Sequence, residues 1–305
     1  MVLVFALAIL LDLMLGEPPL LIHPVVWTGR LAAKVTKPFG SKWHGAFVWC
    51  LSVIPMEIGL LLLVRTSYLY LPLGIILSAF ILKTTFSIKM LRTLVRKSFP
   101  LREESRIPVS QMVRRDVWKI DLGHVASASI ESLFESTVDG ITGPIFWYIL
   151  LGLPGALLQR LANTMDSMVG YLTPELREEG YLSAKIDTVL NYIPARLTFL
   201  VMLLAGTLLG MKPLNAIRVL KNSKMQSVNA IYPIAAAAGL LGVRLEKIDA
   251  YSVGQGELPS SLDIKRALRL FDLTLCIFLV LSISLNYYFY GLSLFGHPYG
   301  LVELL

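Results

Sequence analysis

The sequence has 305 residues, of which 55% are hydrophobic and 16% are charged, and its mean hydropathy is +0.66. Soluble domains carry about 25% charged residues, so this composition excludes an ordinary soluble protein and predicts an integral membrane protein. The net charge of +7 is read as a sign of membrane topology rather than of nucleic-acid binding, because cytoplasmic loops retain Lys and Arg. Cys50 and Cys276 lie in apolar runs, and neither has a partner at metal-ligand spacing.

Several apolar segments approach the length of about 20 residues that a membrane helix needs. The better candidates are 1–16 (short), 45–64, 67–83 and 270–294. We expect 1–16 to be a retained first membrane helix, because it lacks a basic n-region and a small-x-small cleavage site. The weaker candidates are short or interrupted by Gly and Pro, as re-entrant or cavity-lining segments are: 141–162, 195–211 and 229–243. The sequence therefore predicts an all-α integral membrane protein with about 4–6 membrane helices, some of them broken or re-entrant, and with amphipathic surface helices.

Two basic loops, 30–44 and 83–121, are predicted to be cytoplasmic. Residues 84–140 are expected to form an amphipathic helical region on that side, within one membrane-embedded domain spanning 1–305. The side of loop 163–194 depends on 141–162 and 195–211: the loop lies outside if both span and inside if both are re-entrant. We expect it inside, so that its polar residues can share a site with the carboxylates of 131–139.

Three carboxylates follow one another at helical spacing after the basic region. Glu131, Glu135 and Asp139 stand at i, i+4 and i+8, which places them on one face of a regular helix. Like charges at this spacing repel one another, so a cation should offset them. Mg²⁺ is one choice, because it binds one or two carboxylates and completes its shell with water and phosphate. The other is a solvated face paired with Arg114 and Arg115.

Further polar residues interrupt or border apolar segments. They are Asp12, Glu17, His23, Arg30, Asn163, Asp166, Asp187, Asn191, Arg196 and Asn229. Asp12 at membrane depth is costly, which favours a functional role, whereas a lone His23 before a proline favours capping or packing. Carboxylates for Mg²⁺, Arg for phosphate and amides for orientation together suit phosphate chemistry. The sequence has no Walker A motif, dinucleotide fingerprint, serine elbow or zinc motif.

These polar stretches, with their order and spacing, resemble the CbiB/CobD family of cobalamin-biosynthesis membrane proteins, the adenosylcobinamide-phosphate synthases. The resemblance runs nearly end to end. It rests on the stretches "DLMLGEPPLLIHPVVWTGRL", "VSQMVRRD", "ESLFESTVDGITGPIFW", "GLPGALLQRLANTMDSMVGY", "KIDTVLNYIPARLT" and "VNAIYPIAAAAGLLGVRLE". The stretches "NTMDSMVGY" and "NYIPARLT" are the most specific of these.

The resemblance implies an amide ligation that joins adenosylcobyric acid to (R)-1-aminopropan-2-ol phosphate or a related amino-alcohol phosphate. ATP would be consumed as a substrate with Mg²⁺, through an acyl phosphate. The implied acid/base or Mg–nucleotide residues are Glu131, Glu135, Asp139 and Asp166, with Mg²⁺ at Glu135, Asp139 and Asp166. The residues implied to bind phosphate or orient substrate are Arg30, Arg115, Asn163, Asp187, Asn191, Arg196 and Asn229. Membrane lipid and other membrane-bound late cobalamin enzymes are the further implied partners, and no nucleic acid is expected.

Two other functions remain open at this stage. A Mg²⁺-dependent intramembrane prenyltransferase-like enzyme also uses spaced Asp and Asn on helices, but the sequence lacks a second aspartate-rich D-x-x-x-D segment. A non-catalytic subunit of a corrinoid-assembly complex is the alternative outside enzymes.

Overall fold

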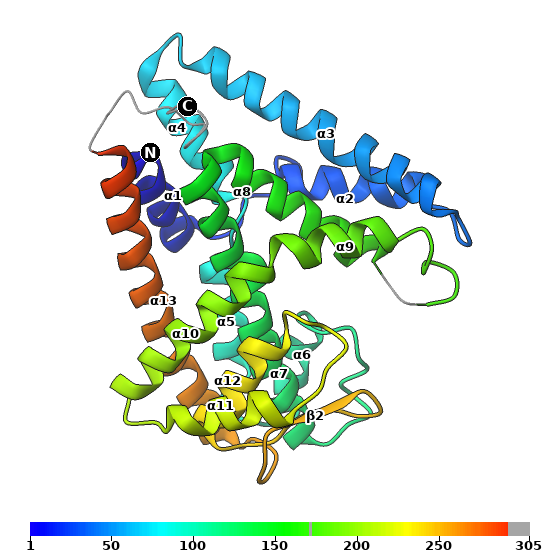
Figure 1. Cartoon of the computed structure of the whole chain (residues 1–305), viewed down its shortest axis with the longest axis vertical. Helices are drawn as coiled ribbons and strands as arrows, with labels where there is room; N and C mark the ends of the chain where they lie inside the picture. Colours follow the sequence, from blue (N-terminus) through cyan, green and yellow to red (C-terminus); the bar gives the residue numbers. More distant parts are fainter. Residues whose placement is uncertain (171–172, 292–305) are drawn as a thin grey trace. The chain divides into compact units, whose positions relative to one another are not determined.

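The computed structural model describes residues 1–170 and 173–291, and Figure 1 shows it as a succession of helices. The α-helices are α1 (Val2–Leu15), α2 (Pro24–Val35), α3 (Lys42–Ser67), α4 (Leu71–Lys83), α5 (Ile88–Lys97), α6 (Arg106–Ser110), α7 (Leu122–Thr137), α8 (Gly143–Val169), α9 (Tyr181–Leu190), α10 (Tyr192–Leu208), α11 (Pro213–Asn222), α12 (Ile231–Leu241) and α13 (Ser261–Tyr290). Two short helices, η1 (Glu103–Ser105, 3₁₀) and η2 (Val138–Thr142, π), and the antiparallel strands β1 (Leu245–Lys247) and β2 (Tyr251–Val253) complete the described residues.

Four helical stretches of the described residues are long and apolar enough to cross a membrane. They are Lys42–Ser67, Leu71–Lys97, Leu122–Val169 and Ser261–Tyr290. Helices α9 and α10, separated at Asn191, would make a fifth span if counted together, and α1 and α12 are shorter apolar helices. The prediction of an all-α, multi-pass membrane protein is confirmed. The prediction that a span continues to residue 294 concerns 292–294, which lie outside the described residues.

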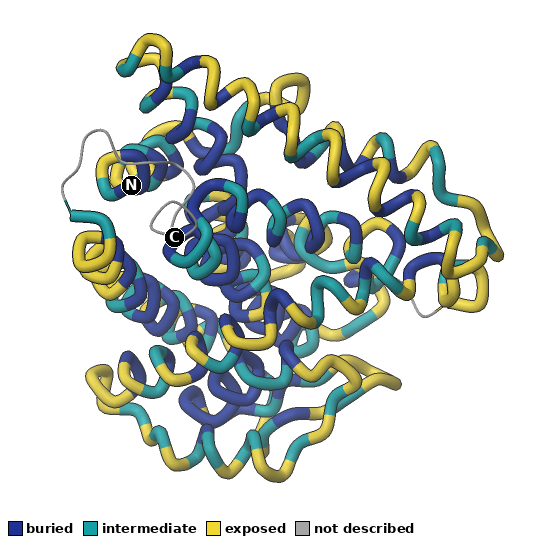
Figure 2. The backbone as a smooth tube through the Cα atoms, turned by 45° about the horizontal axis from the view of Figure 1, so that its top comes forward, coloured by how far each residue is buried: buried dark blue, intermediate teal, exposed yellow. Residues whose placement is uncertain are grey.

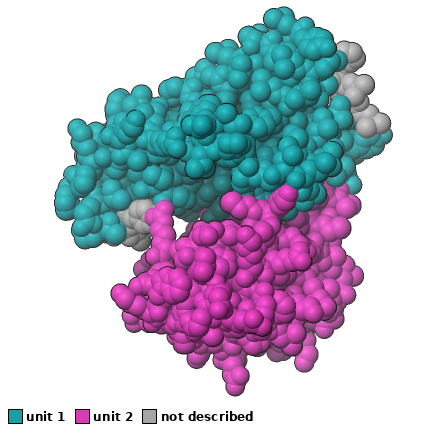
Figure 3. Space-filling view, turned by 180° about the vertical axis from the view of Figure 1, so that it is seen from behind, with its two compact units in different colours: residues 1–88, 139–191, 282–305 teal, residues 89–138, 192–281 magenta. Residues whose placement is uncertain are grey.

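The chain forms two compact units, coloured in Figure 3. Unit 1 contains 1–88, 139–191 and the chain from 282 onward, and unit 2 contains 89–138 and 192–281. Each unit is therefore built from sequence-distant segments. The expectation of a single functional domain stays a prediction.

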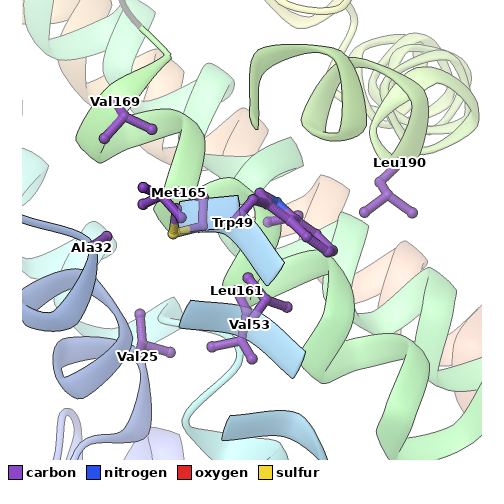
Figure 4. Packing of buried hydrophobic residues seen from close by; sticks show 10 residues of the cluster. Val25, Ala32, Trp49, Val53, Leu161, Met165, Val169 and Leu190 are labelled. Carbon is purple, nitrogen blue, oxygen red and sulfur yellow. The ribbon is translucent and has the colours of Figure 1, made fainter. Parts of the chain in front are cut away.

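The core of unit 1 is a cluster of apolar side chains from α2, α3, α8 and α9 (Figure 4). It contains Val25, Ala32, Val48, Trp49, Val53, Leu161, Ala162, Met165, Val169 and Leu190. Burying a large aliphatic or aromatic side chain contributes about 1.5–3 kcal/mol, so this cluster fixes the second half of α8 against its neighbours. That half of α8 carries Asn163 and Asp166, two of the polar residues that the sequence singled out.

Helix α8 is broken where the sequence predicted an interrupted segment. Gly152 has φ 67° and ψ −151°, a conformation that is essentially restricted to glycine, and Pro154 follows it. Proline removes a backbone donor and clashes with the preceding turn, so the pair divides α8 into two helices. The segment 141–162 is therefore irregular, as expected.

Unit 2 is organised around two largely buried helices, α7 and α12. Figure 2 colours the backbone of the chain by burial. Helix α12 packs against α10 and α11, and contacts α7, which also packs on β1. The approach of α11 to α12 is close: a Cβ at Gly239 would lie 2.3 Å from the Cα of Ala216. Small residues at positions 235–239 therefore allow the two backbones to meet, which explains the Ala-rich sequence.

The helices between residues 84 and 140 are of two kinds. Helix α5 is amphipathic as expected: Ile88, Leu91 and Val95 are buried, while Arg96 and Lys97 are exposed. Phe99 follows the end of the helix and is 40% exposed. By contrast, α7 is buried on nearly every side from position 125 to 134, because β1, α6 and α12 cover it.

Candidate functional site

A single π-helical turn, η2, interrupts the regular helix at a predicted site residue. Helix α7 ends at Thr137, and Asp139 and Gly140 lie within η2. The expectation that Glu131, Glu135 and Asp139 share a face of one regular helix is wrong at its last member, because i→i+5 bonding widens the turn there. Single π turns inside α-helices occur frequently at functional sites, and this one is the centre of the polar contacts of unit 1.

An amide–carboxylate network packs on one side of the π turn. The Asp187 carboxylate accepts hydrogen bonds from Asn163 Nδ2 at 3.1 Å and from Asn191 Nδ2 at 2.9 Å. The amide of Gln159, which is fully buried, donates to Asn191 Oδ1 at 2.9 Å and to the backbone oxygen of Asp139 at 3.1 Å. The structure thus brings together Asn163, Asp187 and Asn191, three of the residues that the resemblance implies orient substrate, and connects them to the backbone of Asp139.

A network of charges packs on the same turn through the neighbouring residue. The backbone N–H of Ser87 donates to Gly140 O at 3.1 Å, and the Ser87 hydroxyl donates to Glu17. Glu17 also pairs with Lys83 Nζ at 3.0 Å and His23 Nε2 at 3.1 Å. Lys83 reaches Asp12 as well, at 3.3 Å, and both side chains are almost completely buried. A buried charge needs a partner, so Asp12 and Lys83 stabilise each other within the apolar helices α1 and α4.

The environment of Glu17 favours its ionised form. Burial alone would raise the pKa of this carboxyl, but hydrogen bonds from His23 and Ser87 and the charge of Lys83 outweigh burial and lower the pKa to about 2. Glu17 is therefore a carboxylate throughout the physiological range. Its role in the structure is to hold the histidine, the lysine and the serine in one arrangement beside the π turn.

Sequence reasoning missed three members of these networks: Gln159, Lys83 and Ser87. The sequence could have indicated Gln159, because it is a polar residue within an apolar run and lies one helical turn before Asn163. Lys83 was assigned to a cytoplasmic loop from its charge, although it is 2% exposed at the end of α4. No local pattern singles out Ser87, whose contacts come from residues 53 and 70 positions away.

In unit 2, Glu131 is the centre of a separate buried network. Its side chain is 2% exposed, and its oxygens accept from Arg115 Nη2 at 2.9 Å, from the Ser127 hydroxyl at 2.6 Å and from the Tyr251 hydroxyl. Burial and the Glu131 carboxylate both raise the pKa of Tyr251, which stays a hydrogen-bond donor. Three donors therefore hold Glu131 of α7 in place. Its ion pair with Arg115 ties α7 to the loop that precedes it, and its hydrogen bond with Tyr251 ties α7 to β2.

A second pair of predicted residues meets in unit 2. Arg196 Nη1 donates to Asn229 Oδ1 at 3.3 Å and to the backbone oxygen of Tyr192 at 2.6 Å. The guanidinium carbon lies 3.3 Å from the ring centroid of Tyr192 and 4.3 Å from that of Tyr232. Cation–π contacts with two rings hold the planar group in one orientation, which suits a residue that binds an anion through a fixed fork.

The remaining predicted residues differ in exposure. Arg30 is exposed on α2, Glu135 is exposed on α7, and Asp166 is half-buried near the end of α8. Asp139 is half-buried, and it joins the unit 1 network through its backbone oxygen. Within residues 1–170 and 173–291, no group of three or more His, Cys, Asp or Glu side chains is arranged to hold a metal ion. The carboxylates fit Mg²⁺ only as one or two ligands of an ion that also binds phosphate.

Comparison with known proteins gives the family. The family model described as "CobD/Cbib protein" matches residues 5–272. A probable cobalamin biosynthesis protein CobD of Methanothermobacter thermautotrophicus is 39% identical over 90% of this chain and 94% of its own length. Its counterpart in Pyrococcus abyssi is 40% identical over 90% of this chain and 92% of its own length. No solved structure matches the chain. On this similarity, which spans nearly the whole sequence, the chain belongs to the CobD/CbiB family of membrane proteins of cobalamin biosynthesis.

Proposed function

We propose that this protein is an adenosylcobinamide-phosphate synthase, which forms the amide bond between adenosylcobyric acid and (R)-1-aminopropan-2-ol phosphate or a related amino-alcohol phosphate. The observation that supports the proposal most is the network of Asn163, Asp187, Asn191 and Gln159 beside the π turn. Within a family that makes cobalamin, a half-buried carboxylate held by two asparagine amides, one of which accepts from Gln159 in turn, is a preorganised polar site, which an inert membrane subunit would not need.

The reaction proceeds in two steps. A propionate oxygen of the corrinoid attacks the γ-phosphorus of ATP, which releases ADP and leaves an acyl phosphate. The amine of the amino-alcohol phosphate then attacks the acyl carbon; the C–N bond forms, the C–O bond to phosphate breaks, and a base takes the proton from the nitrogen. Asp166 is the base in this proposal, because it is half-buried in α8 one turn beyond Asn163.

The remaining residues bind and orient the substrates. Asn163 and Asn191 hold the Asp187 carboxylate, which fixes the side-chain geometry before substrate arrives. Arg196, stacked between Tyr192 and Tyr232, is one phosphate ligand, and Arg30 and Arg115 are further candidates. Asp139 would hold Mg²⁺, which when bound with ATP neutralises the charge that develops on the transferred phosphate.

The test is turnover by the purified protein with ATP, Mg²⁺, adenosylcobyric acid and aminopropanol phosphate. We expect one amide product and one ADP per turnover. Asp166→Asn should abolish product without loss of membrane insertion, and Asp249→Asn, at an exposed loop carboxylate, is the matched control. A folded wild-type protein that makes no amide product refutes the synthase, and full activity of Asp166→Asn removes this residue from the site.

The active site is proposed to face the cytoplasm, because its substrates are cytoplasmic. A cysteine at Lys185, which is exposed on α9, reports the side of loop 163–194 in sealed inside-out and right-side-out vesicles. Cys50 and Cys276 are exposed and must first be replaced, so that labelling comes from the new thiol alone. Labelling in right-side-out vesicles would contradict this orientation.

A further inference from the structure

Arg160 lies beside the π turn and has no polar partner for its guanidinium. It follows Gln159 in α8 and precedes Asn163 by one turn. Its Nε is buried from solvent and has no hydrogen-bond partner. Within the described ranges 1–170 and 173–291, its side chain also forms no ion pair within 4.0 Å of a carboxylate. A guanidinium carries five N–H donors, and the buried one at Nε has no acceptor, which is costly.

The charges around Arg160 compensate it without contacting it. Glu17 and Asp139 are the acidic groups whose charge acts on the guanidinium, and neither forms a hydrogen bond to it. Glu17 is already bound by Lys83, His23 and Ser87, so it is not free to turn toward Arg160. These two carboxylates offset part of the electrostatic cost of burying the Arg160 guanidinium, and they leave its N–H groups available to another anion.

The neighbouring backbone faces the guanidinium without a side chain of its own. A Cβ added to Gly140 would lie 3.4 Å from Arg160 Nη1, so the glycine leaves open the space that a side chain would fill. Arg160 is half-buried, which shows that solvent reaches part of the side chain. A second unsatisfied atom lies on the adjacent residue: Gln159 Oε1 is buried without a donor. Helix α8 therefore carries an unsatisfied donor and an unsatisfied acceptor on consecutive residues beside the turn.

We propose that Arg160 binds the phosphate group of a soluble phosphate monoester, the amino-alcohol phosphate of the proposed reaction. A guanidinium fork matches the oxygens of a phosphate, and the hydrogen bond between two charged groups is about twice as strong as a neutral one. An amino-alcohol phosphate also carries an N–H donor, the kind of group that the unsatisfied oxygen of Gln159 accepts. This assignment rests on the proposed function for the identity of the ester, and it adds a phosphate ligand that the sequence did not indicate.

Binding is measured without turnover, so that this assignment and the synthase reaction can fail separately. The probe is 2-aminoethyl phosphate, titrated into the detergent-solubilised protein while the thermal midpoint is followed, because a ligand that binds only the folded state raises it. The variants are Arg160→Gln, which removes the charge, and Arg160→Lys, which keeps the charge and loses the fork. Arg96→Gln, at an exposed arginine of α5, is the matched control.

We expect Arg160→Gln to weaken the binding of 2-aminoethyl phosphate by about tenfold or more, Arg160→Lys by a smaller factor, and Arg96→Gln not at all. If Arg160→Gln does not fold, a weaker dissociation constant for Arg160→Lys than for Arg96→Gln supports the proposal and equal constants overturn it. No stabilisation of the wild-type protein by the probe, or equal affinity in Arg160→Gln, also overturns it.

A second set of measurements separates the soluble ester from a lipid headgroup. The same proteins are placed in nanodiscs of phosphatidylcholine with or without phosphatidylglycerol. Stabilisation by phosphatidylglycerol that depends on Arg160, without any effect of 2-aminoethyl phosphate, would assign the guanidinium to lipid and refute the proposal. Binding of the probe in pure phosphatidylcholine nanodiscs supports it. Loss of the synthase reaction with retained binding would refute only the proposed function.

Discussion

Replacing Gln159 with leucine tests whether the amide network holds unit 1 together. The two residues have similar volumes, so the change removes hydrogen bonds without opening a large cavity. Gln159 is fully buried and donates both of its hydrogens, to Asn191 Oδ1 and to the backbone oxygen of Asp139. Leucine leaves both acceptors without this donor, at about 1–3 kcal/mol each, so we expect a loss of about 2–6 kcal/mol.

Thermal unfolding in detergent measures this loss. A change of this size should lower the thermal midpoint by roughly 5–10 °C. Gln111→Leu is the control, because Gln111 is exposed and its replacement should change stability by less than about 0.5 kcal/mol. If the two leucine variants unfold at the same temperature, Gln159 does not support the site, and the network is not the element that orders Asp187.

Four further predictions concern other parts of the molecule. The pKa of Glu17 falls from 4.5 to about 2 on folding, which contributes about 3 kcal/mol to the free energy of unfolding. This contribution is present above pH 4.5 and is lost as the pH falls toward 2, so Glu17→Gln should flatten the pH dependence of the free energy of unfolding in that window. Tyr251→Phe removes one donor to a buried carboxylate and should lower the free energy of unfolding by about 1–3 kcal/mol, as measured by denaturant titration. Arg196→Lys loses the stacked fork and should raise the KM for the phosphate substrate, an idea that an unchanged KM would rule out. Gly152→Ala places a side chain at φ 67° and should cost about 1–3 kcal/mol, whereas an unchanged midpoint would show that α8 can straighten there.

Hydropathy and the positions of glycine and proline predicted most of the membrane helices and their breaks. The predicted spans at 45–64 and 67–83 correspond to α3 and α4, because about 20 consecutive apolar residues have few alternatives to a membrane helix. The glycines and the proline of 141–162 correctly indicated a break, although not that it falls at Gly152 itself. Charge was less reliable, as Lys83 shows: buried lysines paired with acids from distant helices look, in a sequence, like those of a loop.

Part of the site was equally predictable. Asp187 and Asn191 are one turn apart on a short helix, so helical spacing alone placed them together. Their link to Asn163 joins residues 24 positions apart, and it followed only from residue chemistry. The positions of Gln159 and Arg160 required the fold, because what distinguishes them is a set of tertiary neighbours. The π turn also had no signal in the sequence, and it shifts Asp139 from the face that regular spacing gives.

The π turn makes helical content a poor measure of an intact site. A single π turn is equivalent to one residue inserted into an α-helix, so deleting one residue from 138–142 would allow regular α-helix to continue from Leu122 to the break at Gly152. Circular dichroism would report an unchanged or slightly more helical protein. The oxygens that now accept from Gln159 and Ser87 would nevertheless be rotated away from these donors. A variant with an insertion or deletion at this turn would therefore fold as a membrane protein but lose its activity.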